Sequence, residues 1–169
     1  MIYIQTDEQH IITNVIEADN ALAKDWGLFP FYESAEIGAV YLPYLAERIA
    51  QRIANSKAAL ADYLSGNPLT WLDGKRYTVT EEKQTLLMSN IASYQLEVQI
   101  NPAAELTWNA AGEVCTPWTF ENLCALAIAI TQYVKPLVAC QQKTEVAMQA
   151  AQTLEALEAI PVDYAGGVQ

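Results

Sequence analysis

The sequence predicts an α+β fold, in which about four helices are interleaved with two short β-hairpins and follow an N-terminal arm of strands and aromatic residues. Two observations carry this prediction. Apolar residues recur with the 3.6-residue period of a helix in three separate stretches of the chain. Between these stretches, short runs rich in Thr, Trp, Tyr and Val flank turns that contain glycine, which is typical of hairpins.

Residues 1–44 form the predicted N-terminal arm. Within it, residues 2–5 and 11–16 are β-branched and partly alternating, so we expect a hairpin joined by the polar residues 6–10. From residue 25 to residue 44, aromatic side chains are punctuated by Gly and Pro without a helical period, which predicts an ordered loop. The arm holds seven acidic residues and one basic residue, a net charge of −6.

The aromatic residues of this arm leave two interpretations open. The loop packs as a strap over its own domain, or it forms a patch that docks on a partner, because Trp, Tyr and Phe are enriched at the centres of protein interfaces. On the second interpretation, the partner-binding residues are Trp26, Phe29, Phe31 and Tyr32.

A first long helix is predicted from Tyr44 to Leu64. Pro43 suits the first position of a helix, and the Ser-Gly-Asn-Pro sequence at 65–68 ends it. Residues spaced by three and four positions along this helix are mostly apolar: Ala46, Ile49, Ile53, Ser56, Leu60 and Tyr63. Because the pattern is short and contains a serine, we expect the helix to pack against its own chain and not to form a free-standing coiled coil.

Two hairpins are predicted in the middle of the chain. Asp73-Gly74 lies between residues 69–72 and 75–79, and this dipeptide is a strong signal for a tight hairpin turn. The second hairpin has strands at 106–108 and 113–115, joined by the sequence Asn-Ala-Ala-Gly.

A helix is predicted between the two hairpins. Thr80 can cap its N-terminus, and Glu81 and Glu82 give its first turn the negative charge that the helix dipole favours. Asn101-Pro102 ends it. Its apolar residues fit one helical face: Leu86, Leu87, Ile91, Tyr94 and Val98.

The last helical region is predicted to begin at Thr116-Pro117 or at Thr119 and to reach about Ile160. Pro136 lies inside it and lacks the N–H that would bond back one turn, so we expect a kink or a break there. Pro161 ends the region, and we expect residues 161–169 to form a flexible tail. The predicted organisation is therefore the arm, an α+β domain at 45–160, and this tail.

Composition excludes one class of function. The chain has 169 residues, of which 9 are Lys or Arg and 20 are Asp or Glu, which gives a net charge of −11. A protein that holds nucleic acid by neutralising phosphates needs a basic surface, and this chain has a pI near 4.3. Charged residues make up only 17% of the chain, against about 25% in an average soluble protein. This low fraction is typical of surfaces that face other proteins.

Residues for catalysis or metal binding are few. We expect His10, the only histidine, to be a solvated loop residue. Three cysteines without a CxxC pair indicate neither a disulfide framework nor a zinc site, and we expect Cys124 and Cys140 to be buried thiols. The carboxylate pairs, Glu81 with Glu82 and Glu155 with Glu158, have ordinary explanations on helix surfaces. We therefore predict no catalytic, cofactor-binding or metal-binding residues.

The predicted compartment follows from two features. The N-terminus lacks the basic region of a signal peptide, and the longest wholly apolar run, residues 123–130, is too short to cross a membrane. We therefore expect a soluble intracellular protein.

The order of motifs from about residue 44 to residue 160 resembles a known family. The motifs are, in order, Ala46-Glu47-Arg48-Ile49 in a helix, Gly74-Lys75-Arg76-Tyr77 in a strand, Thr107-Trp108 with a Gly turn, and Ala150-Ala151-Gln152-Thr153-Leu154-Glu155-Ala156-Leu157 in a last helix. In this order they resemble the C-terminal domain of unknown function found in many tail-fibre and tail-fibre-assembly proteins of tailed bacteriophages. The resemblance does not extend to the first 44 residues.

The resemblance implies a non-enzymatic assembly chaperone that binds the phage tail fibre, in the host cytoplasm during assembly. The alternative is a structural tail component that is retained in the virion, and a small intracellular enzyme is a third hypothesis. The resemblance further implies that three copies would associate around a threefold axis. We also expect no cofactor, and the charge and the short apolar run lead us to expect no nucleic-acid or membrane partner.

Overall fold

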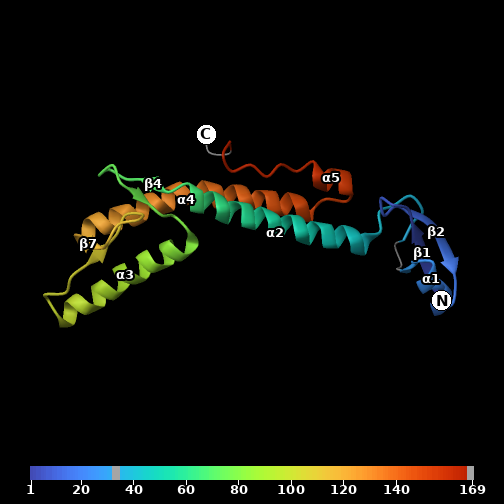
Figure 1. Ribbon diagram of the computed structural model, residues 1–169, viewed down its shortest axis with the longest axis horizontal. Coiled ribbons are helices and arrows are strands. Elements are labelled where there is room, and N and C mark those ends of the chain that lie inside the picture. The colour runs from blue at the N-terminus through green and yellow to red at the C-terminus, as the bar shows by residue number, and fades with distance from the viewer. Residues whose placement is uncertain (32–34, 167–169) are drawn as a thin grey trace. The chain divides into compact units, whose positions relative to one another are not determined.

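The computed structural model describes residues 1–31 and 35–166, and it has the predicted α+β fold (Figure 1). The elements follow one another in this order: β1 (Ile2–Thr6), β2 (Ile12–Glu17), α1 (Asn20–Asp25), β3 (Phe29–Pro30), α2 (Leu42–Gly66), β4 (Leu69–Thr70), β5 (Arg76–Tyr77), α3 (Glu81–Ile100), β6 (Thr107–Trp108), β7 (Thr116–Pro117), α4 (Phe120–Gln149) and α5 (Leu154–Glu158).

The chain divides into two compact units, and the division differs from the predicted one. The first unit combines residues 1–54 with 145–161, and the second combines 55–144 with 162–166. The predicted boundary at residue 44 is therefore not the structural one. The reason is that the start of α2, the end of α4 and α5 supply apolar residues to the first unit.

A three-stranded antiparallel sheet with the order β2–β1–β3 opens the first unit. The predicted hairpin is confirmed, since Ile4 pairs with Val15. The Asp7 carboxylate organises its turn by accepting hydrogen bonds from the backbone N–H groups of Gln9 and Ile11, both at 2.9 Å. The pairing register shifts between Gln5 and Thr6, which marks a bulge next to this turn.

The segment that follows the hairpin contains two elements that the sequence did not predict. Helix α1 is capped by Asp19, whose side chain accepts a hydrogen bond from the Leu22 N–H at 2.8 Å. Strand β3 lies in the region expected to be a loop and pairs with β1. A strand of two residues has no alternation to detect, so only its partner strand defines it.

Helix α2 contributes to the core of the first unit through Leu45, Ile49 and Ile53. These side chains pack with a second set of apolar residues from α4, α5 and the loop between them: Met148, Ala151, Leu154 and Leu157. The prediction that this helix packs against its own chain is therefore confirmed.

Ion pairs hold α5 against the start of α2. Glu158 accepts hydrogen bonds from Arg48 at 2.9 Å and from Arg52 at 2.7 Å. The Arg52 guanidinium also donates to the Ile160 carbonyl oxygen at 2.8 Å, just after the end of the short helix. The hydrogen bond with Glu158 raises the pKa of Arg48, which stays charged.

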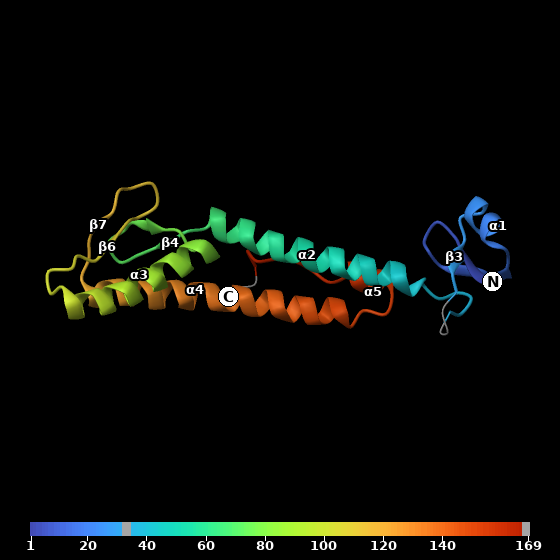
Figure 2. The same cartoon turned by 90° about the horizontal axis from the view of Figure 1, so that it is seen from below.

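The second unit contains both predicted hairpins, β4–β5 and β6–β7, which lie toward the end where α4 begins (Figures 1 and 2). Their turns depend on Gly74 and Gly112, which both have φ of +78°, a conformation that side chains rarely adopt. The Ala111 N–H donates to the Arg76 carbonyl oxygen at 2.8 Å and so joins the two hairpins.

Helix α3 begins as predicted, with the Thr80 side chain accepting from the Lys83 N–H. Its residues Leu87 and Ile91 are buried in the core of the second unit. Leu86, which the sequence placed on the same face, is 46% exposed, because it lies 100° around the helix from Leu87. The other buried apolar side chains of this core come mainly from α4: Leu123, Leu126, Ile130, Val134 and Leu137.

Helix α4 is continuous through Pro136, so the break considered there does not occur. Because Pro136 has no N–H, the carbonyl of Gln132 lacks its usual partner in the helix. Both residues are exposed, so water can take the place of that partner. The buried neighbours Val134 and Leu137 hold the helix in the core. Helix α4 is also long and apolar enough to cross a membrane, with a mean hydropathy of 1.7 over its most apolar window. Core helices of soluble proteins often meet the same criterion, and 33% of this window is buried.

The predicted helix up to Ile160 is interrupted after Gln149, and α5 restarts with Thr153 as its cap, which accepts from the Ala156 N–H at 3.1 Å. The prediction of a flexible tail is wrong at Tyr164, whose side chain is buried in the core of the second unit and bonded to Ser56. The serine that interrupted the apolar pattern of α2 is thus the partner of this tyrosine.

Candidate partner-binding surface

The structure separates the four predicted partner-binding residues. Trp26 follows α1 as its C-cap and is 57% exposed, and Phe31, just after β3, is 40% exposed. Phe29 is half-buried within β3. Tyr32 lies outside the described residues. The sequence pattern treated these residues as one patch, but only Trp26 and Phe31 are shown to offer large aromatic surface to solvent.

Phe29 has a packing role in the first unit, and its part in partner binding stays a prediction. Its backbone lies opposite Ile4 in the sheet, and its ring centroid is 4.7 Å from that of Tyr41. Ile4, Ile12 and Tyr41 are the buried residues of this small core. This packing agrees with the strap interpretation at Phe29.

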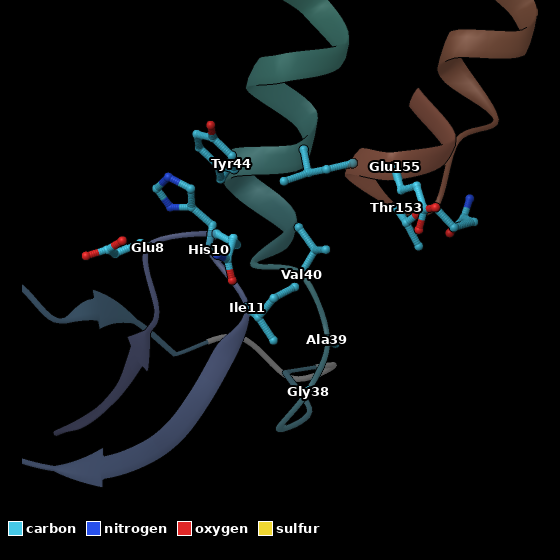
Figure 3. Close-up of a pocket in the computed structure, with 12 residues that line it drawn as sticks. Glu8, His10, Ile11, Gly38, Ala39, Val40, Tyr44, Thr153 and Glu155 are labelled. Atoms are coloured by element: carbon cyan, nitrogen blue, oxygen red, sulfur yellow. The ribbon is translucent and has the colours of Figure 1, made fainter. Parts of the chain in front are cut away.

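His10 is also placed differently from the prediction of a solvated loop residue. Its imidazole is stacked on the Tyr44 ring, with centroids 3.5 Å apart and an angle of 21° between the planes (Figure 3). Its Nδ1 atom is buried without a hydrogen-bond partner among the described residues. The residue has a positive φ of 59°, which the tight turn after Asp7 requires.

A pocket of about 570 Å³ lies beside this stacked pair (Figure 3). It is lined by the hairpin turn, by the segment from Gly38 to Val40 and by the start of α5. The Glu8 and Glu155 side chains give it acidic character. Among residues 1–31 and 35–166, no group of three His, Cys, Asp or Glu side chains is arranged to hold a metal ion.

The exposed surface of the first unit combines apolar side chains with negative charge. Leu22 and Trp26 are four residues apart, so they share one side of α1, and both are exposed. Ile37 adds a further exposed apolar side chain. Sequence reasoning missed Leu22 and Ile37, although the spacing of Leu22 from Trp26 was a signal for a short amphipathic helix.

The charge of this unit is strongly negative. Residues 1–54 and 145–161 contain eleven carboxylate side chains and three basic ones, a net charge of −8. Two of the three basic side chains, Arg48 and Arg52, bind Glu158. The remaining 98 residues carry only −3. Of the −8, residues 1–44 carry −6, as noted from the sequence, and the other residues of the first unit add only −2.

A second concave surface, of about 630 Å³, lies between the hairpins of the second unit and is lined by Trp71 and Trp118. Its polar groups bond to one another: the Tyr77 hydroxyl donates to the Asp73 carboxylate at 2.7 Å, and Lys75 pairs with Glu113. Burial, followed by the bond with Asp73, raises the pKa of Tyr77. The sequence indicated Asp73 only as a turn residue, so this use of its carboxylate was missed.

The remaining candidate groups are ordinary parts of the fold. Glu81 and Glu82 lie in the first turn of α3. Cys124 and Cys140 are half-buried and pack against the core of the second unit, while Cys115 is an exposed free thiol. These positions bring together no nucleophile and base among the described residues.

Comparison of the chain with protein-family models, with curated proteins and with solved structures finds no match.

Proposed function

We propose that this protein is a non-enzymatic assembly factor of a tailed bacteriophage, which binds the tail fibre before the fibre joins the virion. The order of motifs between residues 44 and 160 supports this proposal through the resemblance described above. On this proposal the protein acts in the host cytoplasm during assembly.

The observation that carries the proposal is the exposed apolar side chains of the first unit, Leu22, Trp26 and Phe31. Large aromatic side chains are unfavourable in contact with water, and binding of a partner removes this unfavourable free energy. Trp is among the residues that contribute most to binding energy. An assembly factor must cover apolar surface of an unassembled partner, and these side chains are suited to it.

The charge of the same unit specifies the partner's chemistry. A net charge of −8 favours a fibre segment that carries Lys or Arg around an apolar centre. Electrostatic steering would speed association with such a segment, and added salt would slow it.

Co-expression with a tail fibre encoded beside this gene tests the proposal. We expect soluble, correctly assembled fibre only when this protein is present, and co-purification of the two chains. The double variant Trp26→Ala/Phe31→Ala should lose co-purification. The control Leu72→Ala/Val114→Ala removes two exposed apolar side chains from the second unit and should retain it.

Fibre that assembles equally well alone would contradict the assembly role. Mass spectrometry of purified virions distinguishes the assembly factor from the alternative, a structural tail component, because a structural component is present in fixed proportion to the fibre.

A further inference from the structure

Helix α3 has a second face with large apolar side chains that its own unit does not cover. Leu86, Leu96 and Ile100 are 46%, 67% and 89% exposed. Ser89 and Ser93 lie between them and are exposed as well. The five positions are spaced by three, four, three and four residues, so they form one continuous uncharged stripe, which we call the α3 seam.

The α3 seam lies opposite the face that packs in the core. Leu87 and Ile91 are buried, and Tyr94 and Val98 are half-buried. At 100° per residue, these four side chains centre about 150° from the centre of the seam. In Figure 1, no other helix or strand of the second unit is drawn beyond α3 on the side away from α4.

The spacing and the charge of the α3 seam point to another helix as its occupant. Alternating steps of three and four residues are the a and d positions of helices that pack side by side. No charged residue occurs between Lys83 and Glu97, although the chain has a net charge of −11. Most of the surface is acidic and repels a second copy of the same chain, but the uncharged stripe does not, so two copies can approach each other along it.

We propose that α3 pairs with α3 of a second copy of this chain in antiparallel orientation, across a twofold axis. This pair takes the place of the threefold association that the family resemblance implies. In this arrangement each a position lies opposite a d position. Leu86 then packs on Leu96 of the second copy, and Ser89 packs on Ser93. Ile100 lies opposite Glu82 at each end of the pair, where the carboxylate reaches water.

The two serines suit the centre of such a pair. Their small side chains let the backbones approach closely, and the leucines fill the space on both sides of them. A serine hydroxyl in a helix can donate to a carbonyl oxygen of its own helix one turn earlier, so Ser89 and Ser93 need no partner across the interface. The centre of the seam can therefore leave water without an unpaired hydroxyl group.

Charge complementarity sets the orientation. The antiparallel pair brings Lys83 beside Glu97 of the second copy, and the twofold axis repeats this contact, so two ion pairs flank the seam. A parallel pair would instead place Glu82 beside Glu82 of the second copy, and the two negative charges would repel each other. The Lys83 ammonium lies 5.6 Å from the centre of the Trp108 ring, and Glu97 is exposed.

Sedimentation velocity of the full chain tests the pairing. We expect a dimer at about 100 µM, and Leu96→Lys should weaken it at least about tenfold, because each dimer buries this leucine twice. The control Ile128→Lys alters a residue of α4 that is 59% exposed, and should leave the dimer intact. Circular dichroism of both variants shows that they are folded.

The charge exchange tests the orientation. Lys83→Glu and Glu97→Lys should each weaken the dimer, and the double variant should restore it. A wild-type monomer at this concentration, a trimer, or a dimer insensitive to Leu96→Lys would overturn the proposal. A wild-type monomer whose fibre binding is lost in Leu96→Lys would assign the seam to the fibre. A double variant as weak as the single ones would overturn the antiparallel orientation.

Discussion

The side chain of Tyr164 and residue Ser56, which lie 108 positions apart, form a reciprocal pair of hydrogen bonds inside the second unit. The Tyr164 hydroxyl donates to the Ser56 carbonyl oxygen at 2.9 Å. Since that hydroxyl has one proton, the Ser56 hydroxyl, 2.8 Å away, donates to Tyr164. Both residues are buried, so the chain after Pro161 returns to the core at this point.

Tyr164→Phe should destabilise the protein by about 1–3 kcal/mol, because it leaves the buried Ser56 hydroxyl without this partner. Urea unfolding measures the change in the free energy of unfolding. Ser56→Ala provides the complementary single variant, and the double variant should cost less than the sum of the two, because neither hydroxyl of the pair is then left alone. Strict additivity would show that the two hydroxyl groups do not interact.

Pro136→Ala should stabilise the protein by about 1–3 kcal/mol, because alanine supplies the N–H that the Gln132 carbonyl lacks and favours a helix interior. Thermal unfolding would detect this as a higher Tm. Ala139→Pro, at another exposed position of α4, should be destabilising by a comparable or larger amount. A lower Tm for Pro136→Ala would mean that the proline's local geometry is needed for packing of α4.

The charge of Asp73 should contribute to stability at neutral pH and not in acid. Burial acts to raise the pKa of this carboxyl, but hydrogen bonds from the Tyr77 hydroxyl and the Lys75 N–H lower it on balance. A lowered pKa in the folded state gives stability that is fully present above the unfolded value of about 3.9 and is lost as the pH falls through the folded value. Asp73→Asn should therefore be less stable than wild type at pH 7, and the difference should vanish in strong acid. A difference that does not change with pH would contradict this.

His10→Gly should be more stable than His10→Ala by about 1 kcal/mol, because both variants lose the stack on Tyr44 but only glycine adopts the positive φ without strain. The difference between the two Tm values then reports the backbone strain of a non-glycine residue with positive φ at position 10. Equal stability of the two variants would show that the turn relaxes when the imidazole is removed.

Local features of the sequence account for the elements that were predicted well. Asp73-Gly74 specifies its turn through one glycine, and Thr80 begins α3 through one hydrogen bond to a neighbour three residues away. Such contacts lie within a few residues, so a pattern reveals them. Strand β3 is different, because its two residues are a strand only through their pairing with β1.

The candidate surface divides in the same way. The sequence identified Trp26 and Phe31 as aromatic side chains in an acidic segment, and both are exposed. It could not distinguish them from Phe29, because the difference lies in the contact of Phe29 with Tyr41. The α3 seam could not be predicted from the sequence either. When a helix has apolar residues on two sides, only the structure shows which side is buried in the core and which is exposed.

The sequence by itself determined the α+β class, the two hairpins, the start of α3 at its threonine cap, and the acidity of the N-terminal part. Tertiary structure alone decided that α4 runs through Pro136, that His10 is half-buried and stacked on Tyr44, and that Tyr164 is anchored on Ser56. The physical reason is the range of the interactions. Turns and caps depend on neighbours along the chain, whereas burial and long-range hydrogen bonds depend on which distant residues the fold brings together.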